Sequence, residues 1–293
     1  MLKETEFKEY LQSEKGSSKS TSQAYASDVK EFDVYLTTKG KNLQSADREN
    51  VKAFIEHLAS EGRTGSSINR KLVSLRKYYD YLKDLGLVSY VPTERVKAPK
   101  PTHRELEYLS IEEIEKILAL PDDSVKGLRD KALLELMYAC GLKVSEACDA
   151  KLKDVDLRIG FISVRASNNK MRIIPIGKPA RAAILKYLSD SRPALLKEKE
   201  DCGKLFLNYA GENVTRQGVW KIIKYYGEQA GIKGELSPQI IRNSFAAHLI
   251  FNGADLKSLQ ELMGTEDAAA TKLFLALSSS RVMDVYDRTH PRA

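Results

Sequence analysis

Positively charged side chains recur at three places in this chain, and the chemistry they suit is phosphate binding. Within 68–83, Arg70 and Lys77 fall opposite an apolar helical stripe, and Lys71 flanks that stripe. A solvated helix face would show the same pattern. A helix lying on a DNA backbone would show it too, because phosphates favour several cations on one face. The other cations of this kind are Lys170 and Arg172 near a hairpin tip, and Arg216 and Lys221 in one helical segment.

The pair Arg216-Gln217 carries side chains that can read base edges. In a major groove, arginine pairs with guanine and glutamine pairs with adenine. Thr215 directly before the pair is a suitable helix N-cap, so the pair would begin a helix. Both interpretations stay open: a base-reading helix start, or a helix start that is merely polar.

The overall composition permits an acidic partner without requiring one. The 293 residues include 47 Lys and Arg against 40 Asp and Glu, a formal net charge of +7. No apolar run approaches the roughly 18 residues that cross a bilayer, and the first residues lack the apolar centre of a signal peptide. These features predict a cytoplasmic protein that is not in a membrane.

The three cysteines predict free thiols rather than a metal site or a disulfide framework. Cys140, Cys148 and Cys202 form no CxxC motif, and two of them lie in or beside an apolar helical stretch. We therefore expect a reducing compartment, no metal and no cofactor.

The first part of the chain has the periodicity of an all-helical domain. Apolar residues from Tyr25 to Leu36 and from about 48 to 58 follow helical spacing. The clearest stripe has spacings of 4, 3, 4 and 3, which place its residues on one helix face. Its members are Ile68, Leu72, Leu75, Tyr79 and Leu82.

A basic, proline-containing segment follows and predicts a domain boundary. Pro92, Pro99 and Pro101 interrupt helix formation and favour extended backbone. We expect a helical domain over 1–90, a linker over 91–107 and a second domain over 108–293.

The second part predicts a mainly helical domain with a small sheet. Ser110 and Glu113 form a capping box, and a long apolar helix spans about 127–140. The stretches 161–165 and 171–176 predict a β-hairpin with a basic tip. Further helices are expected at about 179–190, 215–230, 238–252, 255–263, 266–277 and 281–287.

Several strings, in order and at the expected spacing, resemble one family, that of the Xer-type tyrosine recombinases. The resemblance implies a mainly α fold, with an N-terminal SAM-like core-binding domain and an α-rich catalytic-type domain containing a small antiparallel sheet. The strings are GSSINRKL (65–72), GLKVSE (141–146), DVD (154–156), TRQGVWK (215–221), SPQIIRNSFA (237–246), NGADL (252–256) and HPRA (290–293).

The resemblance also implies a reaction, which is metal-free cleavage of DNA. In the family a tyrosine attacks the scissile phosphate and forms a 3′-phosphotyrosyl bond. Two arginines stabilise the phosphate charge, a lysine on the hairpin protonates the leaving 5′ oxygen, and two histidines assist. In-line positioning and charge stabilisation are what phosphoryl transfer needs.

Five of the six family catalytic positions carry a different residue in this chain. Only Arg242, the second arginine, keeps the family residue. Asn243 stands where a histidine follows that arginine, and Lys170 matches the later lysine of the hairpin turn. The substituted positions are Lys143 for the first arginine, Ser167 for the lysine, Gln239 and Thr265 for the histidines, and Phe274 for the tyrosine.

The substitution at position 274 has the largest chemical consequence, because phenylalanine has no oxygen that could bond to phosphorus. Lys143 keeps a positive charge but lacks the planar fork of arginine, and Ser167 is not a strong general acid near neutral pH. Arg242 would serve either as a phosphate clamp or as a buried structural cation.

Three functions remain compatible with these residues. The first is a double-stranded DNA-binding member of the family that does not cleave DNA. The second is an active recombinase with another nucleophile, for which Tyr286 is the nearest downstream tyrosine. The third is a protein-interaction module without DNA binding. In each case self-association, or association with an active recombinase, would use the C-terminal helix that the family donates to a neighbouring subunit.

Overall fold

The computed structural model of the chain describes residues 4–13, 16–99, 107–165, 170–264 and 275–277. Contacts divide the chain into two compact units, Met1–Glu105 (unit 1) and Leu106–Ala293 (unit 2). Among the described residues, none of the helices is both long and apolar enough to span a bilayer. The fold is mainly helical with one small antiparallel sheet, which confirms the predicted fold class.

Unit 1 consists of four described helices, and its core holds the predicted apolar stripe. The helices are α1 (Glu4–Ser13), α2 (Lys19–Thr37), α3 (Arg48–Ser60) and α4 (Gly65–Asp84). Side chains of Ser18, Asp47 and Thr64 accept backbone hydrogen bonds at the starts of α2, α3 and α4. Helices α2, α3 and α4 were predicted, whereas α1 was not.

The first half of the predicted linker packs on unit 1. Val96 is buried in the same core as the apolar stripe of α4. Arg76 of α4 donates from Nη2 to the Val96 carbonyl at 2.6 Å. Residues up to about 98 therefore belong to unit 1. The prolines predicted only that this segment is extended, and the burial of Val96 is what attaches it to the core.

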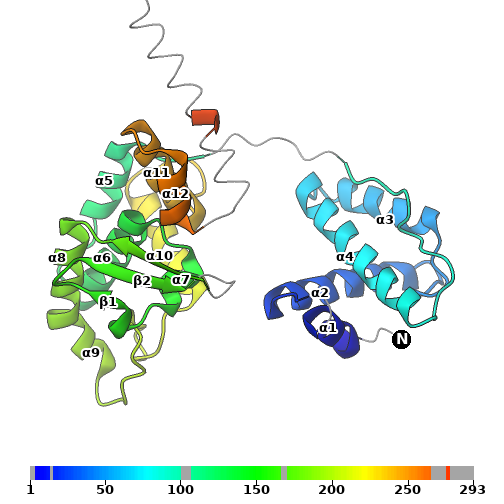
Figure 1. Cartoon of the computed structure of the whole chain (residues 1–293), viewed down its shortest axis with the longest axis horizontal. Coiled ribbons are helices and arrows are strands. Elements are labelled where there is room, and N and C mark those ends of the chain that lie inside the picture. Colours follow the sequence, from blue (N-terminus) through cyan, green and yellow to red (C-terminus); the bar gives the residue numbers. More distant parts are fainter. Residues whose placement is uncertain (1–3, 14–15, 100–106, 166–169, 265–274, 278–293) are drawn as a thin grey trace, which may run out of the picture. The chain divides into compact units, whose positions relative to one another are not determined.

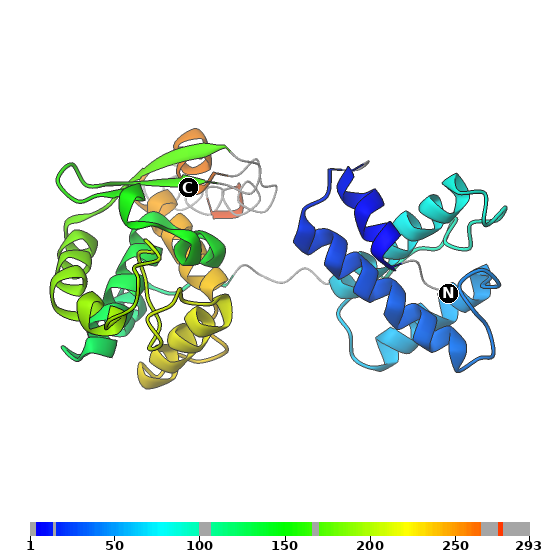
Figure 2. The ribbon, with the colours of Figure 1, turned by 90° about the horizontal axis from the view of Figure 1, so that it is seen from below.

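Unit 2 is built around one buried helix, α6 (Val125–Cys140), which contacts α5 (Ile111–Ala119) and α11 (Pro238–Phe251) (Figures 1 and 2). The predicted capping box is present at the start of α5: the Ser110 hydroxyl accepts from Glu113, and the Glu113 carboxylate accepts from Ser110. A glycine in left-handed conformation, Gly141, ends α6.

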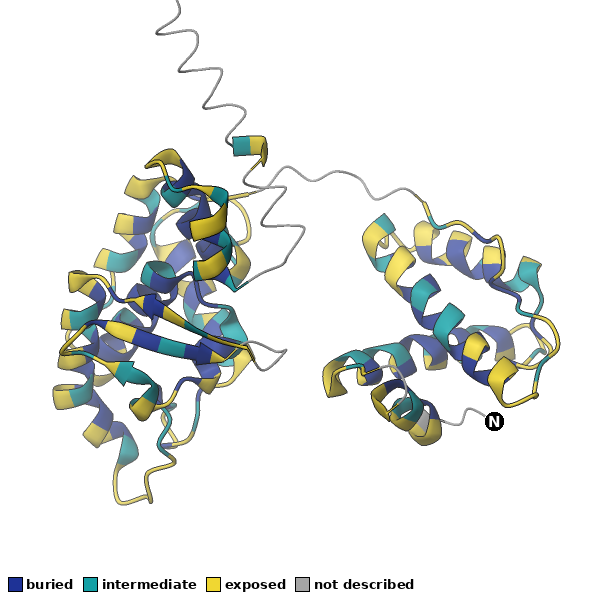
Figure 3. Ribbon diagram, in the orientation of Figure 1, coloured by how far each residue is buried: buried dark blue, intermediate teal, exposed yellow. Residues whose placement is uncertain are grey.

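The sheet has the order β1-β2-β3, with β1 (Val155–Asp156), β2 (Phe161–Arg165) and β3 (Met171–Pro175). In the hairpin, Ser163 pairs with Ile173 and Arg165 pairs with Met171. Burial alternates along β2 (Figure 3), as expected for a strand with one covered face. The hairpin was predicted, whereas β1 was not; the tip at 166–169 lies outside the described residues.

The predicted helices up to residue 263 correspond to described elements, but the short helices η1 (Leu152–Asp154) and α9 (Arg192–Leu196) were not predicted. Two further differences follow. A π-helical turn at Tyr187–Ser191 interrupts the predicted single helix over 179–190, and the six-residue α7 was not predicted. The expected helices at 266–277 and 281–287 fall outside the described residues except for 275–277. The bounds are α7 (Val144–Asp149), η1 (Leu152–Asp154), α8 (Lys178–Lys186), α9 (Arg192–Leu196), α10 (Arg216–Gln229) and α12 (Leu256–Met263).

Candidate nucleic-acid interface

A basic pocket of about 550 Å³ opens in unit 2 between α7, η1, β2 and the start of α10. Its lining has six cationic and three acidic side chains, so its potential is positive. The cations are Lys143, Lys151, Lys153, Arg165, Lys204 and Arg216.

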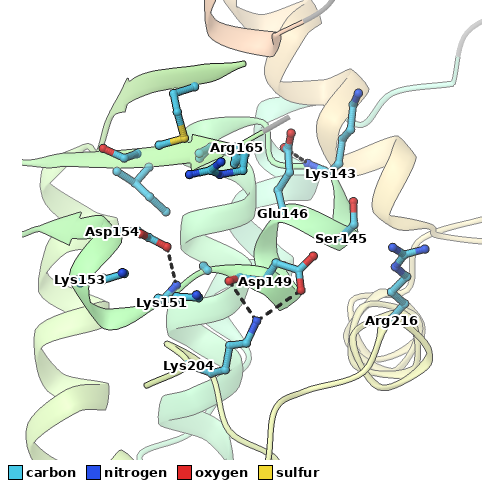
Figure 4. Close-up of a pocket in the computed structure, with 15 residues that line it drawn as sticks. Lys143, Ser145, Glu146, Asp149, Lys151, Lys153, Asp154, Arg165, Lys204 and Arg216 are labelled. Atoms are coloured by element: carbon cyan, nitrogen blue, oxygen red, sulfur yellow. Dashed lines mark hydrogen bonds and ion pairs between the residues drawn. The ribbon is translucent and has the colours of Figure 1, made fainter. Parts of the chain in front are cut away.

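Apart from Lys204, these cations stand in or directly before α7, η1, β2 and α10, and Figure 4 shows how their side chains lie. Lys143 stands directly before α7, and Arg216 stands in the first turn of α10, which contacts α7. Both lie with Ser145 on one side of the pocket, and Lys151 and Lys153 lie on the other side. The Thr215 hydroxyl accepts from the Gly218 N–H and fixes the start of α10.

The three carboxylates in the lining are already engaged. Glu146 pairs with Arg172 at 2.7 Å, and Asp149 pairs with Lys204 at 3.4 Å. Asp154 accepts from the Lys151 backbone N–H at 3.0 Å. Lys143, Lys153 and Arg216 have no ion-pair partner within the described part of the chain. These three cations therefore supply charge that an anion can neutralise.

Glu146 acts as a counter-ion in this pocket rather than as an acid. Burial opposes its ionisation, but hydrogen bonds from the Arg172 guanidinium and the Lys143 backbone N–H outweigh that effect. The nearby charges of Arg172 and Arg242 act in the same direction, so the pKa of Glu146 lies below its ordinary value.

Arg242, the retained family residue, is a buried cation in this structure. Its side chain is 3% exposed. Nη1 donates to the Gly141 carbonyl, and Nη2 donates to the Met263 carbonyl at 2.7 Å. This burial is what the role of a structural cation requires; the phosphate-clamp role stays a prediction.

Arg172 was predicted to bind DNA, but its guanidinium is committed to contacts within unit 2. It donates to both carboxylate oxygens of Glu146 and, through Nε, to the Leu262 carbonyl at 2.8 Å. Because its side chain is only 9% exposed, Arg172 is removed from the set of surface cations. Lys170, Gln217 and Lys221 are exposed, and their contacts with DNA stay predictions.

Lys71 of unit 1 also needs correction, because the polar side of α4 does not face solvent there. Asp28 of α2 is buried and accepts from Lys71, from Arg70 and from the Ser74 hydroxyl. Lys71 also pairs with Glu31 and is 6% exposed. Its ammonium is therefore enclosed, whereas the Arg70 side chain stays 46% exposed beside Asp28.

Lys77 is half-buried and has no ion-pair partner in the described regions. Phosphate contacts by Lys77 and Arg70 stay predictions.

Two other substituted family positions, Gln239 and Asn243, contact each other one turn apart on α11. Gln239 donates from Nε2 to Asn243 Oδ1 at 2.8 Å. Asn243 donates from Nδ2 to the Glu107 carbonyl at 3.0 Å, which ties the start of unit 2 to α11. The remaining family positions, Ser167, Thr265 and Phe274, lie outside the described residues.

Four pocket cations were missed by sequence reasoning: Lys151, Lys153, Arg165 and Lys204. They are dispersed over more than fifty residues and share no helical or strand period. The family-like string at 141–146 marked one wall of the pocket, but no local signal marked the others.

The described cysteines are free, and two of them are buried. Burial raises the pKa of the Cys140 thiol to about 12 and that of Cys148 to about 11. Both thiols are therefore protonated at neutral pH. Within the described residues, no group of three or more His, Cys, Asp or Glu side chains is placed to hold a metal ion.

Comparison with known proteins gives matches along both units. Residues 107–281 match the phage integrase family, and residues 5–86 match the phage integrase N-terminal SAM-like domain. Tyrosine recombinase XerD of Listeria monocytogenes serotype 4b (strain F2365) is 38% identical over 291 residues, covering 98% of each chain. The putative tyrosine recombinase TTE1313 of Caldanaerobacter subterraneus subsp. tengcongensis is 40% identical over 289 residues, also with 98% coverage of each.

Among solved structures, XerH recombinase in a post-cleavage complex with its palindromic difH substrate superposes with a TM-score of 0.76 at 18% identity, covering 97% of this chain and 84% of that one. This likeness concerns the fold. The family matches and the full-length relatives confirm the resemblance of the sequence strings: the chain belongs to the phage integrase family of tyrosine recombinases.

Proposed function

We propose that this protein binds double-stranded DNA as a tyrosine recombinase family member and does not cleave it. The observation that carries the proposal is the combination of a basic pocket at the family's first-arginine position, Lys143, with a phenylalanine at the nucleophile position, 274. Binding rests on cations, and covalent cleavage rests on an attacking oxygen, so one function can persist without the other.

The pocket supports the binding half of the proposal. Lys143, Lys153 and Arg216 have no ion-pair partner among the described residues, and the exposed start of α10 places Gln217 beside Arg216. Solved proteins of the same fold include XerH with its difH substrate and a λ integrase tetramer on a Holliday junction. A duplex phosphate backbone is the ligand class that such a surface suits.

The sequence supports the non-cleaving half. Phe274 removes the nucleophile, and the substitutions at Lys143, Ser167, Gln239 and Thr265 remove or weaken the groups that assist it. Because these groups act together on one transition state, restoring a single one does not restore the reaction. Such a protein would occupy one recombination half-site and associate with an active relative, or it would regulate access to a recombination site. The association would use the C-terminal helix that the family resemblance implies.

The test combines a gel shift on duplex DNA with a suicide substrate that traps covalent adducts. We expect the wild-type chain to shift the duplex and to form no denaturant-resistant adduct. The matched variant Phe274→Tyr should also form none, because the other four positions stay substituted. A covalent adduct with the wild-type chain would contradict the proposal.

An active recombinase is the second candidate, favoured by full-length relatives named XerD at 38% identity. It requires another nucleophile, for which Tyr286 is the nearest downstream tyrosine. If an adduct forms, mass spectrometry names the attached residue, and Tyr286→Phe should abolish it. A chain that shifts no DNA even at low salt would instead support the third function, a protein-interaction module.

A further inference from the structure

Three buried charged side chains of unit 2 converge on the end of one helix, and we call Glu146, Arg172 and Arg242 the α12 clamp. Their side chains are 5%, 9% and 3% exposed. Glu146 accepts from Arg172 at 2.7 and 2.8 Å and lies 3.9 Å from Arg242. Glu146 is thus a counter-ion to both guanidinium groups, and all three side chains are at most 9% exposed.

The two arginines bind the last carbonyls of α12. Arg172 donates to Leu262, and Arg242 donates to Met263, directly before the left-handed Gly264. The last carbonyls of a helix lack partners within the helix. They also carry partial negative charge, which a cation stabilises. Side chains from β3 and α11 therefore fix the end of α12 from two directions.

Arg242 also reaches a second helix end. Its Nη1 donates to the carbonyl of Gly141, which terminates α6 in left-handed conformation. One guanidinium therefore bridges the C-terminal ends of α6 and α12, and its planar group with several N–H donors in fixed directions suits two acceptors at once.

Both glycine turns fit closely against the residues of this region. A Cβ at Gly141 would lie 2.2 Å from the Phe245 ring of α11, and a Cβ at Gly264 would lie 2.8 Å from the Arg172 side chain. The backbone at both turns is therefore packed as well as hydrogen-bonded.

We infer that Arg242 is a positioning residue in this protein: as part of the α12 clamp it holds the helix end from which the segment with Thr265 and Phe274 continues, and it leaves the phosphate contact to Lys143. Lys143 lines the basic pocket without an ion-pair partner in the described regions. The phosphate contact rests on the proposed function, whereas the α12 clamp itself does not.

The test measures two quantities on the full chain: hydrogen exchange of the amides in 256–263, and the salt dependence of binding to a defined duplex. Arg242→Gln should accelerate exchange in α12 by about tenfold or more, as expected when hydrogen bonds from a charged donor are lost, and should leave the salt slope unchanged. Arg172→Gln should behave in the same way. Lys143→Gln should leave hydrogen exchange in α12 unchanged. It should make the slope of log affinity against log salt shallower by about 0.9, because one phosphate contact is lost.

Two results overturn the inference. One is a fall in the salt slope for Arg242→Gln equal to that for Lys143→Gln; the other is unchanged exchange in α12. If Arg242→Gln does not fold, Arg242→Lys replaces it, because lysine keeps the charge but lacks the fixed planar fork that holds both carbonyls, and exchange should still rise. If the wild-type chain binds no DNA, the proposed function fails, and the exchange measurements alone decide on the α12 clamp.

Discussion

At the scale of single residues, the charged side chains of this protein divide into those that hold the fold and those that line the pocket without an ion-pair partner among the described residues. Asp28 belongs to the first kind, because its carboxylate is buried and accepts from Arg70, Lys71 and Ser74. Lys143 and Arg216 belong to the second kind. Residue type alone does not separate the two kinds, since both contain lysine and arginine.

Asp28→Asn should destabilise unit 1 strongly. It leaves the enclosed Lys71 ammonium with Glu31 as its remaining carboxylate partner, and breaking a buried pair costs about 3 kcal/mol. Urea unfolding followed by circular dichroism measures the loss. The single tryptophan, Trp220, lies on α10 and reports on unit 2, so its fluorescence transition should stay in place.

The matched control is Glu49→Gln, which breaks the surface pair between Glu49 and Lys52. Glu49 is 75% exposed, so the expected change is within about 0.5 kcal/mol. An equal effect of both variants would show that the Asp28 cluster contributes no more than a surface ion pair.

At the scale of elements, the ends of helices position the site more than their lengths do. The left-handed Gly141 turns the chain from α6 into α7 and so places Lys143 and Glu146 at the pocket. The Thr215 cap places Arg216 at its opposite wall. The first turn of α10 has no acidic residue, so its partial positive charge adds to that of the pocket.

Gly141→Ala should therefore damage unit 2 by two additive effects. A left-handed alanine costs about 1–2 kcal/mol, and its Cβ would lie 2.2 Å from the Phe245 ring, which adds about 1–3 kcal/mol of overpacking. Trp220 fluorescence during urea unfolding measures the sum.

Gly231→Ala is the control for this variant. Gly231 has a similar φ of +69° and no atom within 4 Å of the added Cβ, so it shows the backbone effect alone. If both variants lower the free energy of unfolding by the same amount, the contact between the added Cβ at position 141 and Phe245 of α11 costs no stability.

At the scale of the whole molecule, each unit by itself carries cations that an anion can neutralise. Lys77 in unit 1 and Arg216 in unit 2 have no ion-pair partner in the described parts of the chain. The net charge of +7 favours association with nucleic acid in a salt-dependent way.

We expect Lys77→Gln and Arg216→Gln each to make the negative slope of log affinity against log salt shallower by about 0.9. The double variant should make it shallower by the sum of the two changes. Fluorescence anisotropy on one duplex over a range of NaCl concentrations measures the slopes. A double variant that equals either single variant would mean that only one of the two side chains contacts DNA.

The local chemistry of the sequence determined much of this protein. Helical spacing predicted α2, α3, α4 and α6, the Ser110–Glu113 pair predicted the start of α5, and alternating strands predicted the hairpin. The family strings predicted the family, which the full-length relatives confirm. The assignments of Lys143 as a site residue and of Phe274 to the nucleophile position stay predictions. Periodicity and caps act over a few residues, which is why they can be read from the chain directly.

Only the tertiary structure decided which cations face inward. Lys71 appeared to flank a surface stripe, yet it pairs with Asp28, which lies 43 residues earlier in the chain. Arg242 is enclosed by helix ends 101 and 21 residues away. A buried charge needs partners that local spacing does not reveal, so burial of a cation is determined by the elements that pack around it.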